Sequence, residues 1–144
     1  MRPITALVIH CSATRPGEDI GAEEIDAWHR ARGFDCLGYH FVIRRDGTIE
    51  PGRPPARAGA HAAGHNEASL GLCLVGGLSE AGRAENNFGP PQWAALKGLL
   101  IDLKEAFPGA DILGHRDLPG VIKQCPSFDA RAWAAAERLN HADF

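Results

Sequence analysis

The amino-acid sequence predicts an α/β fold in which helices flank a mixed central β-sheet. Short apolar runs rich in β-branched residues alternate along the chain with segments that carry apolar residues at helical spacing, as in a sheet covered by helices. One Asp-Gly pair between two strand-like segments predicts an antiparallel hairpin within that sheet. The length of 144 residues suits one ordinary domain, and no internal repeat or linker divides residues 1–144.

Five segments are expected to form strands, because they are apolar or alternate in polarity and end at turn residues: residues 5–10, 39–44, 48–50, 70–75 and 111–113. Asp46 and Gly47 form the predicted hairpin turn between the second and third of these segments. Residues 52–64 are rich in Pro, Gly and Ala and are expected to form one long loop. Loops of this length in small domains are often functional.

Three segments are expected to form helices. Residues 21–32 place Ile25 and Trp28 on one face, and residues 91–107 repeat large apolar side chains at helical spacing. Residues 128–139 form a terminal helix, for which Asp129 is the expected N-cap. Together with the strands, these helices complete the predicted order of elements.

Charge and composition exclude several classes of protein. The net charge is −3, so broad electrostatic contact with nucleic acid is not expected. No apolar run approaches the roughly 20 residues that span a bilayer, and the start of the chain lacks the features of a secretory signal. We therefore expect a cytoplasmic protein that does not bind membranes. We also expect it to be a monomer. It would reach an extracellular target only through a separate pore protein or lysis.

The four cysteines form no C-x-x-C pair. Cys36 and Cys73 lie in apolar surroundings and are expected to be small buried side chains. Cys125 differs, because it lies in a loop directly before Pro126. It is a candidate for metal binding or for nucleophilic chemistry.

A possible metal site is distributed over three distant positions. His10 ends a predicted strand, His115 follows a short strand and a glycine, and Cys125 lies in a later loop. Strand ends meet at one edge of a parallel sheet, and two imidazoles with a thiolate are good zinc donors. Three protein ligands leave a fourth position open, as in catalytic zinc sites. The spacing alone is equally compatible with ordinary core or surface histidines.

The chain also contains a series of motifs in a fixed order. They are residues 8–14 (VIHCSAT), 38–43 (GYHFVI), 45–48 (RDGT), 61–62 (HA) with Asn66, 69–71 (SLG), 74–77 (LVGG), 114–117 (GHRD) and 123–129 (KQCPSFD). This series resembles the N-acetylmuramoyl-L-alanine amidase and peptidoglycan-recognition protein superfamily. The likeness is strongest to the bacteriophage amidases that are historically called lysozymes, and it covers nearly the whole chain.

The resemblance implies the peptidoglycan-recognition/amidase fold and a specific activity. It implies hydrolysis of the amide bond between N-acetylmuramic acid and L-alanine in bacterial peptidoglycan, as in an endolysin of a phage or prophage. One zinc ion (Zn²⁺) would be held by His10, His115 and Cys125. Tyr39 and Lys123 match the two catalytic positions of the family.

Amide hydrolysis explains why such residues would stand together. Zinc makes water nucleophilic near neutral pH, and the charge of Lys123 would stabilise the oxyanion. Tyr39 would orient the water or donate a proton. His61 would bind substrate or hydrogen-bond a zinc ligand, and Asp117 is a candidate acceptor for the second ring N–H of His115. A structural role is expected for His40, and a surface position for His29.

Several alternatives remain open from the sequence. Some members of the superfamily bind peptidoglycan without cleaving it, although these typically lack the cysteine ligand. A metal-free cysteine hydrolase using Cys125 is a second alternative, and a cytosolic amidase that recycles soluble muropeptides is a third. The related phage amidases also bind and restrain their own phage RNA polymerase, so such a partner is a further possibility.

Overall fold

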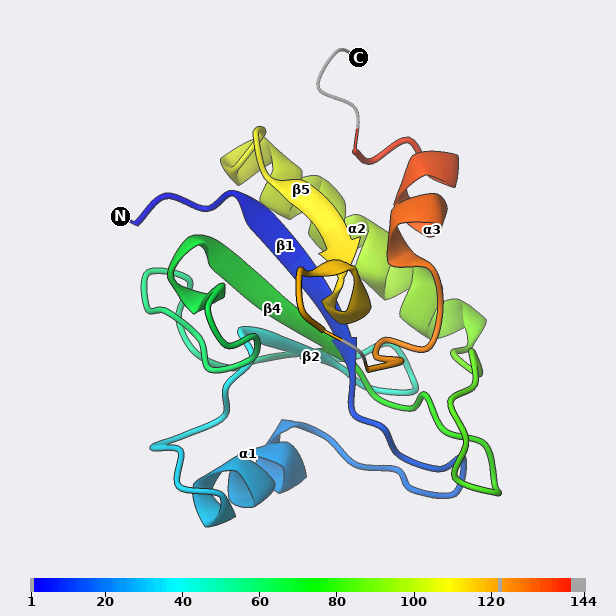
Figure 1. The fold of residues 1–144 in the computed structure, drawn as a ribbon. Coiled ribbons are helices and arrows are strands. Elements are labelled where there is room, and N and C mark those ends of the chain that lie inside the picture. The colour runs from blue at the N-terminus through cyan, green and yellow to red at the C-terminus, as the bar shows by residue number, and fades with distance from the viewer. Residues whose placement is uncertain (1, 122, 141–144) are drawn as a thin grey trace.

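The computed structural model describes residues 2–121 and 123–140. It contains one five-stranded sheet, shown in Figure 1, whose strands lie in the order β3-β2-β4-β1-β5. The strands are β1 (Ala6–Cys11), β2 (Phe41–Ile43), β3 (Ile49–Pro51), β4 (Ser69–Leu74) and β5 (Asp111–Gly114). β2, β4, β1 and β5 pair in parallel, and only β3 is antiparallel. The predicted mixed sheet is therefore confirmed.

Side-chain alternation divides the sheet into two different faces. On one face, leucines and isoleucines of β1 and β4 pack against helices α2 (Pro90–Ala106) and α3 (Ala130–Ala136), which lie together in Figure 1. On the other face, α1 (Ala22–Ala31) covers β2 and the end of β4 through Ile25, Val42 and Cys73. His10 alternates with Ile9 and so points away from α2, because successive strand residues face opposite sides.

Most of the predicted elements are confirmed within one or two residues. The hairpin turn is present, since the N–H of Gly47 donates to the carbonyl of Arg44 and Gly47 has a φ of 89°. Asp129 caps α3 through a 3.0 Å hydrogen bond from the N–H of Ala132. Residues 52–64 contain no helix and only connect β3 to the short turn η1 (Asn66–Ala68).

Four predictions about individual positions were wrong. The second strand begins at Phe41, so Tyr39 lies just before it. In α1, the inner face holds Ile25 and His29, while Trp28 is 42% exposed. His29 was expected at the surface but is buried, where its Nδ1 accepts a 2.9 Å hydrogen bond from the N–H of Gly38. Cys73 is buried as expected, but Cys36 is only half-buried.

Among the described residues, no helix has both the length and the apolar character needed to cross a bilayer.

Candidate metal centre

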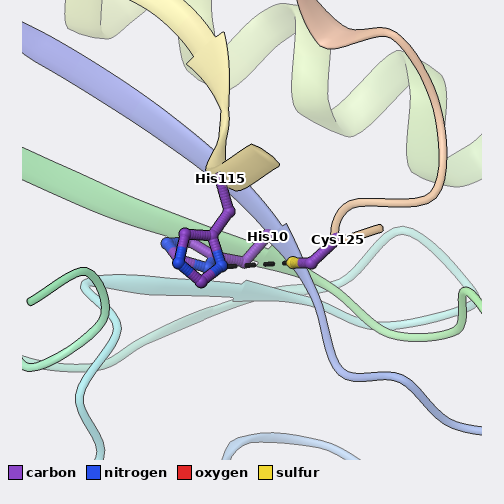
Figure 2. A group of neighbouring side chains, drawn as sticks. All are labelled: His10, His115 and Cys125. Atoms are coloured by element: carbon purple, nitrogen blue, oxygen red, sulfur yellow. Dashed lines mark hydrogen bonds between the residues drawn. The ribbon is translucent and has the colours of Figure 1, made fainter. Parts of the chain in front are cut away.

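The sheet topology brings His10 and His115 to the same edge. β1 and β5 are parallel neighbours, with Ile9 opposite Gly114, so each histidine follows directly after a paired position. His115 begins the 3₁₀ turn η2 (His115–Asp117), which turns its side chain over the end of β1. Figure 2 shows the two imidazoles side by side, and their ring centroids are 4.5 Å apart.

Cys125 reaches the same point from the loop that precedes α3. The N–H of Arg116 donates to the carbonyl of Cys125 across 2.9 Å, which ties this loop to the residue after His115. Gly114 permits the approach, because a Cβ there would lie 2.8 Å from Cδ of Pro126. The three predicted ligands therefore come together from three separate segments.

The distances suit one ion. The nitrogen and sulfur donors of His10, His115 and Cys125 all lie within 4.8 Å of one another. Nδ1 of His10 is 3.9 Å from Sγ of Cys125, the contact drawn in Figure 2. Tetrahedral zinc, with bonds of about 2.0–2.3 Å, separates two such ligand atoms by about 3.5 Å. The donor set of two imidazoles and one thiol fits a zinc ion with little rearrangement.

The surroundings keep both imidazoles neutral. Burial, followed by the neighbouring His61 and His115, holds the pKa of His10 well below its usual value. Burial and then the charge of Lys123 lower the pKa of His115. Neutral imidazole is the form that binds a metal.

The thiol of Cys125 needs a cation before it ionises. Its contact with Cys11, followed by burial, raises the pKa of Cys125. A nucleophilic cysteine requires the opposite shift, toward the thiolate at neutral pH. A bound metal ion reverses the balance, because it removes the proton of a coordinating thiol outright. The environment of Cys125 thus suits a metal ligand better than the nucleophile of a metal-free hydrolase.

Tyr39 and Lys123 both line the cavity at this centre, which has a volume of about 280 Å³. The Tyr39 ring centroid lies 5.0 Å from that of His10. Burial raises the pKa of Tyr39 well above its usual value, so the phenol keeps its proton. Lys123 is exposed and approaches from the loop before Cys125. The two residues can therefore act on a group bound beside the histidines.

A larger cavity of about 610 Å³ adjoins the centre, and the residues that line both cavities are Arg32, Phe34, Ala60, His61, His115 and Lys123. Its remaining wall includes the apolar side chains of Leu118 and Val121. Arg32 and Phe34 were not predicted as site residues, because they follow α1 in a stretch that carries no motif. Their position makes them candidates for contact with substrate.

His61 lies against the metal centre. Its Nδ1 is 2.8 Å from Nε2 of His10. Burial and then the neighbouring His40 lower the pKa of His61 to about 3, so this ring is neutral. His40 itself is buried, and its Nδ1 accepts a 3.0 Å hydrogen bond from the N–H of Gly71. That contact agrees with the structural role expected for His40.

Asp117 does not serve the role that was considered for it. Its Oδ2 accepts a 2.8 Å hydrogen bond from the N–H of Gly114 and so caps the η2 turn. The backbone N–H groups at the start of such a turn have no partner within it, and a carboxylate at the third position of the turn can accept from the residue that precedes the turn. Asp117 therefore positions His115 through the backbone.

Comparison with known proteins agrees with this geometry. Residues 1–128 match the N-acetylmuramoyl-L-alanine amidase family. The chain is 44% identical to the endolysin of Klebsiella phage KP32 over 95% of its own length and 89% of that protein. It is 42% identical to the endolysin of Escherichia phage T7, over 96% and 90% of the two chains.

A solved structure gives the same result. The N-acetylmuramoyl-L-alanine amidase LysC from Clostridium intestinale URNW superposes with a TM-score of 0.80 and 28% identity, covering 96% of this chain and 87% of that one. The resemblance that the motifs indicated is therefore confirmed, as is the amidase fold. This chain belongs to the N-acetylmuramoyl-L-alanine amidase family.

Proposed function

We propose that this amidase hydrolyses the bond between N-acetylmuramic acid and L-alanine with one zinc ion held by His10, His115 and Cys125, and that residues 1–144 act as one domain. The observation that carries the proposal is the meeting of three donor atoms, from three separate segments, within 4.8 Å of one another. Such a three-ligand set leaves a coordination position open for chemistry.

A zinc ion bound there supplies a Lewis acid that polarises the amide carbonyl and makes water nucleophilic near neutral pH. Lys123 places a positive charge at the mouth of the same cavity, where it stabilises the oxyanion that develops on the carbonyl oxygen. The protonated phenol of Tyr39 donates a hydrogen bond or a proton on the inner side of the cavity. The two residues therefore line the same cavity, in which the amide would react.

The adjoining 610 Å³ cavity is the proposed substrate groove. Its apolar wall, which includes Leu118 and Val121, suits the methyl groups of an alanine-containing stem peptide. Arg32 and Lys123 add positive charge that suits the free carboxylates of such a peptide. Peptidoglycan or a soluble muropeptide derived from it is the proposed substrate.

A role in cell lysis is supported by the similarity to phage endolysins along nearly the full chain. We propose that the enzyme attacks intact cell wall after a separate protein opens the way to it. Recycling of soluble muropeptides in the cytosol is the alternative. Rates measured on purified sacculi and on soluble anhydro-muropeptides separate these roles, because a recycling enzyme prefers the soluble substrate.

The activity itself is tested by the release of new amino termini from purified cell wall. We expect release by the zinc-loaded protein, its loss after treatment with a chelator, and its return when zinc is added. Binding to cell wall without release would identify a binding module. Release that survives the chelator would identify a cysteine hydrolase, and either result would overturn the proposal.

A further inference from the structure

An unbroken chain of polar contacts leads from a backbone carbonyl to the metal centre. Oγ of Ser69 lies 2.6 Å from the carbonyl oxygen of His65 and 3.2 Å from Nε2 of His61. Nδ1 of His61 lies 2.8 Å from Nε2 of His10, whose Nδ1 faces Cys125. Each contact has hydrogen-bonding length, and the series ends at the atom offered to the zinc ion.

The directions of these hydrogen bonds follow from counting protons. A carbonyl oxygen only accepts, so the single hydroxyl proton of Ser69 points to His65. Ser69 must then accept at its second contact, which places a proton on Nε2 of His61. A neutral imidazole with Nε2 protonated offers a lone pair at Nδ1. Nε2 of His10 must therefore donate, and its Nδ1 keeps the lone pair that a metal requires.

We propose that Ser69 and His61 form a relay that fixes the tautomer of His10, so that Nδ1 of His10 is always presented unprotonated to the zinc ion. His61 is thus a positioning residue that acts through His10. This inference rests on the proposed function, because it takes His10 to be a zinc ligand. Of the two roles expected for His61, the inference favours a hydrogen bond to a zinc ligand over contact with substrate.

The surrounding backbone holds His61 in place for this task. Oδ1 of Asn66 accepts hydrogen bonds from the N–H groups of His61 and Ala62, at 3.0 and 2.9 Å. Gly71 on β4 leaves the space for the ring, because a Cβ there would lie 2.6 Å from Cγ of His61. The motif residues His61, Asn66, Ser69 and Gly71 thus all serve one arrangement.

The relay differs from the usual partner of a metal-bound histidine. Such a histidine generally donates its second N–H to a carboxylate, a carbonyl or water. Here the acceptor is a neutral imidazole, which adds no negative charge beside a site that already holds a thiolate. The arrangement orients His10. A carboxylate in the same place would reduce the positive charge that acts on the reacting amide, and a neutral imidazole does not.

Nitrogen NMR of the imidazoles in the zinc-loaded protein tests the proton positions directly. We expect both His61 and His10 to carry the proton on Nε2, and His61 to lose this single tautomer in Ser69→Ala. A proton on Nδ1 of His61 in the wild-type protein would overturn the relay. The wild-type part of the measurement needs no substituted protein, so it stands even if Ser69→Ala fails to fold.

Zinc affinity gives a second test, measured by competition with a chromophoric chelator. His61→Ala should weaken zinc binding by about 10–100-fold, the usual effect of removing a partner of a metal ligand. His61→Asn should bind within a few-fold of wild type, because its Oδ1 can accept from His10 at nearly the same place. His65→Ala is the matched control, since only its backbone carbonyl takes part, and it should be unchanged.

The alternative role gives a different pattern. If His61→Ala keeps its zinc affinity and raises KM instead, His61 holds substrate and the relay is wrong. If the wild-type protein binds no zinc, the proposed function fails. The tautomers of His61 and His10 in that protein still decide whether the relay exists.

Discussion

The backbone N–H of Cys11 donates a hydrogen bond to Sγ of Cys125 across 3.2 Å. The residue that follows the first histidine on β1 therefore orients the thiol that completes the proposed metal centre. An N–H directed at sulfur also favours the thiolate form, which a metal ligand adopts. Strand β1 thus contributes twice to the centre, once through a side chain and once through its backbone.

Removal of this thiol should abolish zinc binding. Cys125→Ala should weaken zinc affinity by more than about 100-fold, because even the indirect partners of metal ligands contribute 10–100-fold. Amidase activity should fall to background. Cys36→Ala is the control, since this half-buried thiol lies away from the centre and contacts Arg57. Equal zinc affinity in the two variants would contradict the ligand set.

Lys123 should affect the reaction and leave zinc binding intact. Lys123→Ala should lower kcat/KM by about 10²–10³, the usual effect of removing a group that stabilises an oxyanion. Zinc content, measured by atomic absorption, should stay at one ion per chain. Gln124→Ala changes the exposed neighbour and should behave like wild type. A loss of zinc in Lys123→Ala would instead indicate a structural role.

Two glycines should respond in opposite ways to the same substitution. Gly114→Ala adds a Cβ 2.8 Å from Cδ of Pro126, so it should lower the free energy of unfolding by about 1–3 kcal/mol and weaken zinc binding. Gly98→Ala lies within α2, where an added Cβ meets no atom within 4 Å. It should stabilise the protein by about 0.5–1 kcal/mol. Urea unfolding measures both, and equal effects would contradict the close approach at Gly114.

Arg32 should contribute to substrate binding through its charge. Arg32→Ala should raise KM for a muropeptide with free carboxylates by about 10-fold, equivalent to about 1.4 kcal/mol of binding free energy. Most of the effect should fall on KM, because Arg32 lines both cavities and is proposed to hold a carboxylate of the substrate and not the reacting amide. Arg83→Ala removes the same charge from an exposed position outside that cavity and serves as the control. An unchanged KM in Arg32→Ala would show that Arg32 does not contribute to substrate binding.

The metal-free protein should lose stability as the solution becomes acidic. Burial lowers the pKa of His29 and of His40 below the usual 6.5, so the unfolded chain takes up protons that the folded protein does not. The free energy of unfolding should therefore fall as pH decreases below about 6.5, by up to about 1.4 kcal/mol per pH unit for each such proton. Urea unfolding at several pH values measures this slope. His29→Asn keeps an acceptor for Gly38 and should reduce it.

The elements of the fold were largely predictable because their signals are local. The apolar strand at residues 5–10 and the helix that carries Leu96 and Leu100 each show their own periodicity. The inner face of α1 was not predictable in the same way. Ile25 has neighbours on its face at both i+3 and i+4, and the choice of His29 over Trp28 depends on the distant N–H of Gly38.

The metal centre could not be predicted without the order of the strands in the sheet. His10 and Cys125 are 115 positions apart, and no spacing rule relates them. Only the order of strands in the sheet, with β1 beside β5, shows that the two histidines meet. Arg32 and Phe34 could not be predicted for the same reason, because the wall of a cavity depends on how separate loops approach one another.

The pairing of β1 with β4 over six positions has a consequence for folding fidelity. If β1 slipped by one residue, every side chain would move to the opposite face, and His10 would enter the apolar layer against α2. Ile9 or Cys11 would then face His115. Zinc would consequently bind only when β1 is paired in the correct register. Zinc binding during refolding would therefore report when that register has formed.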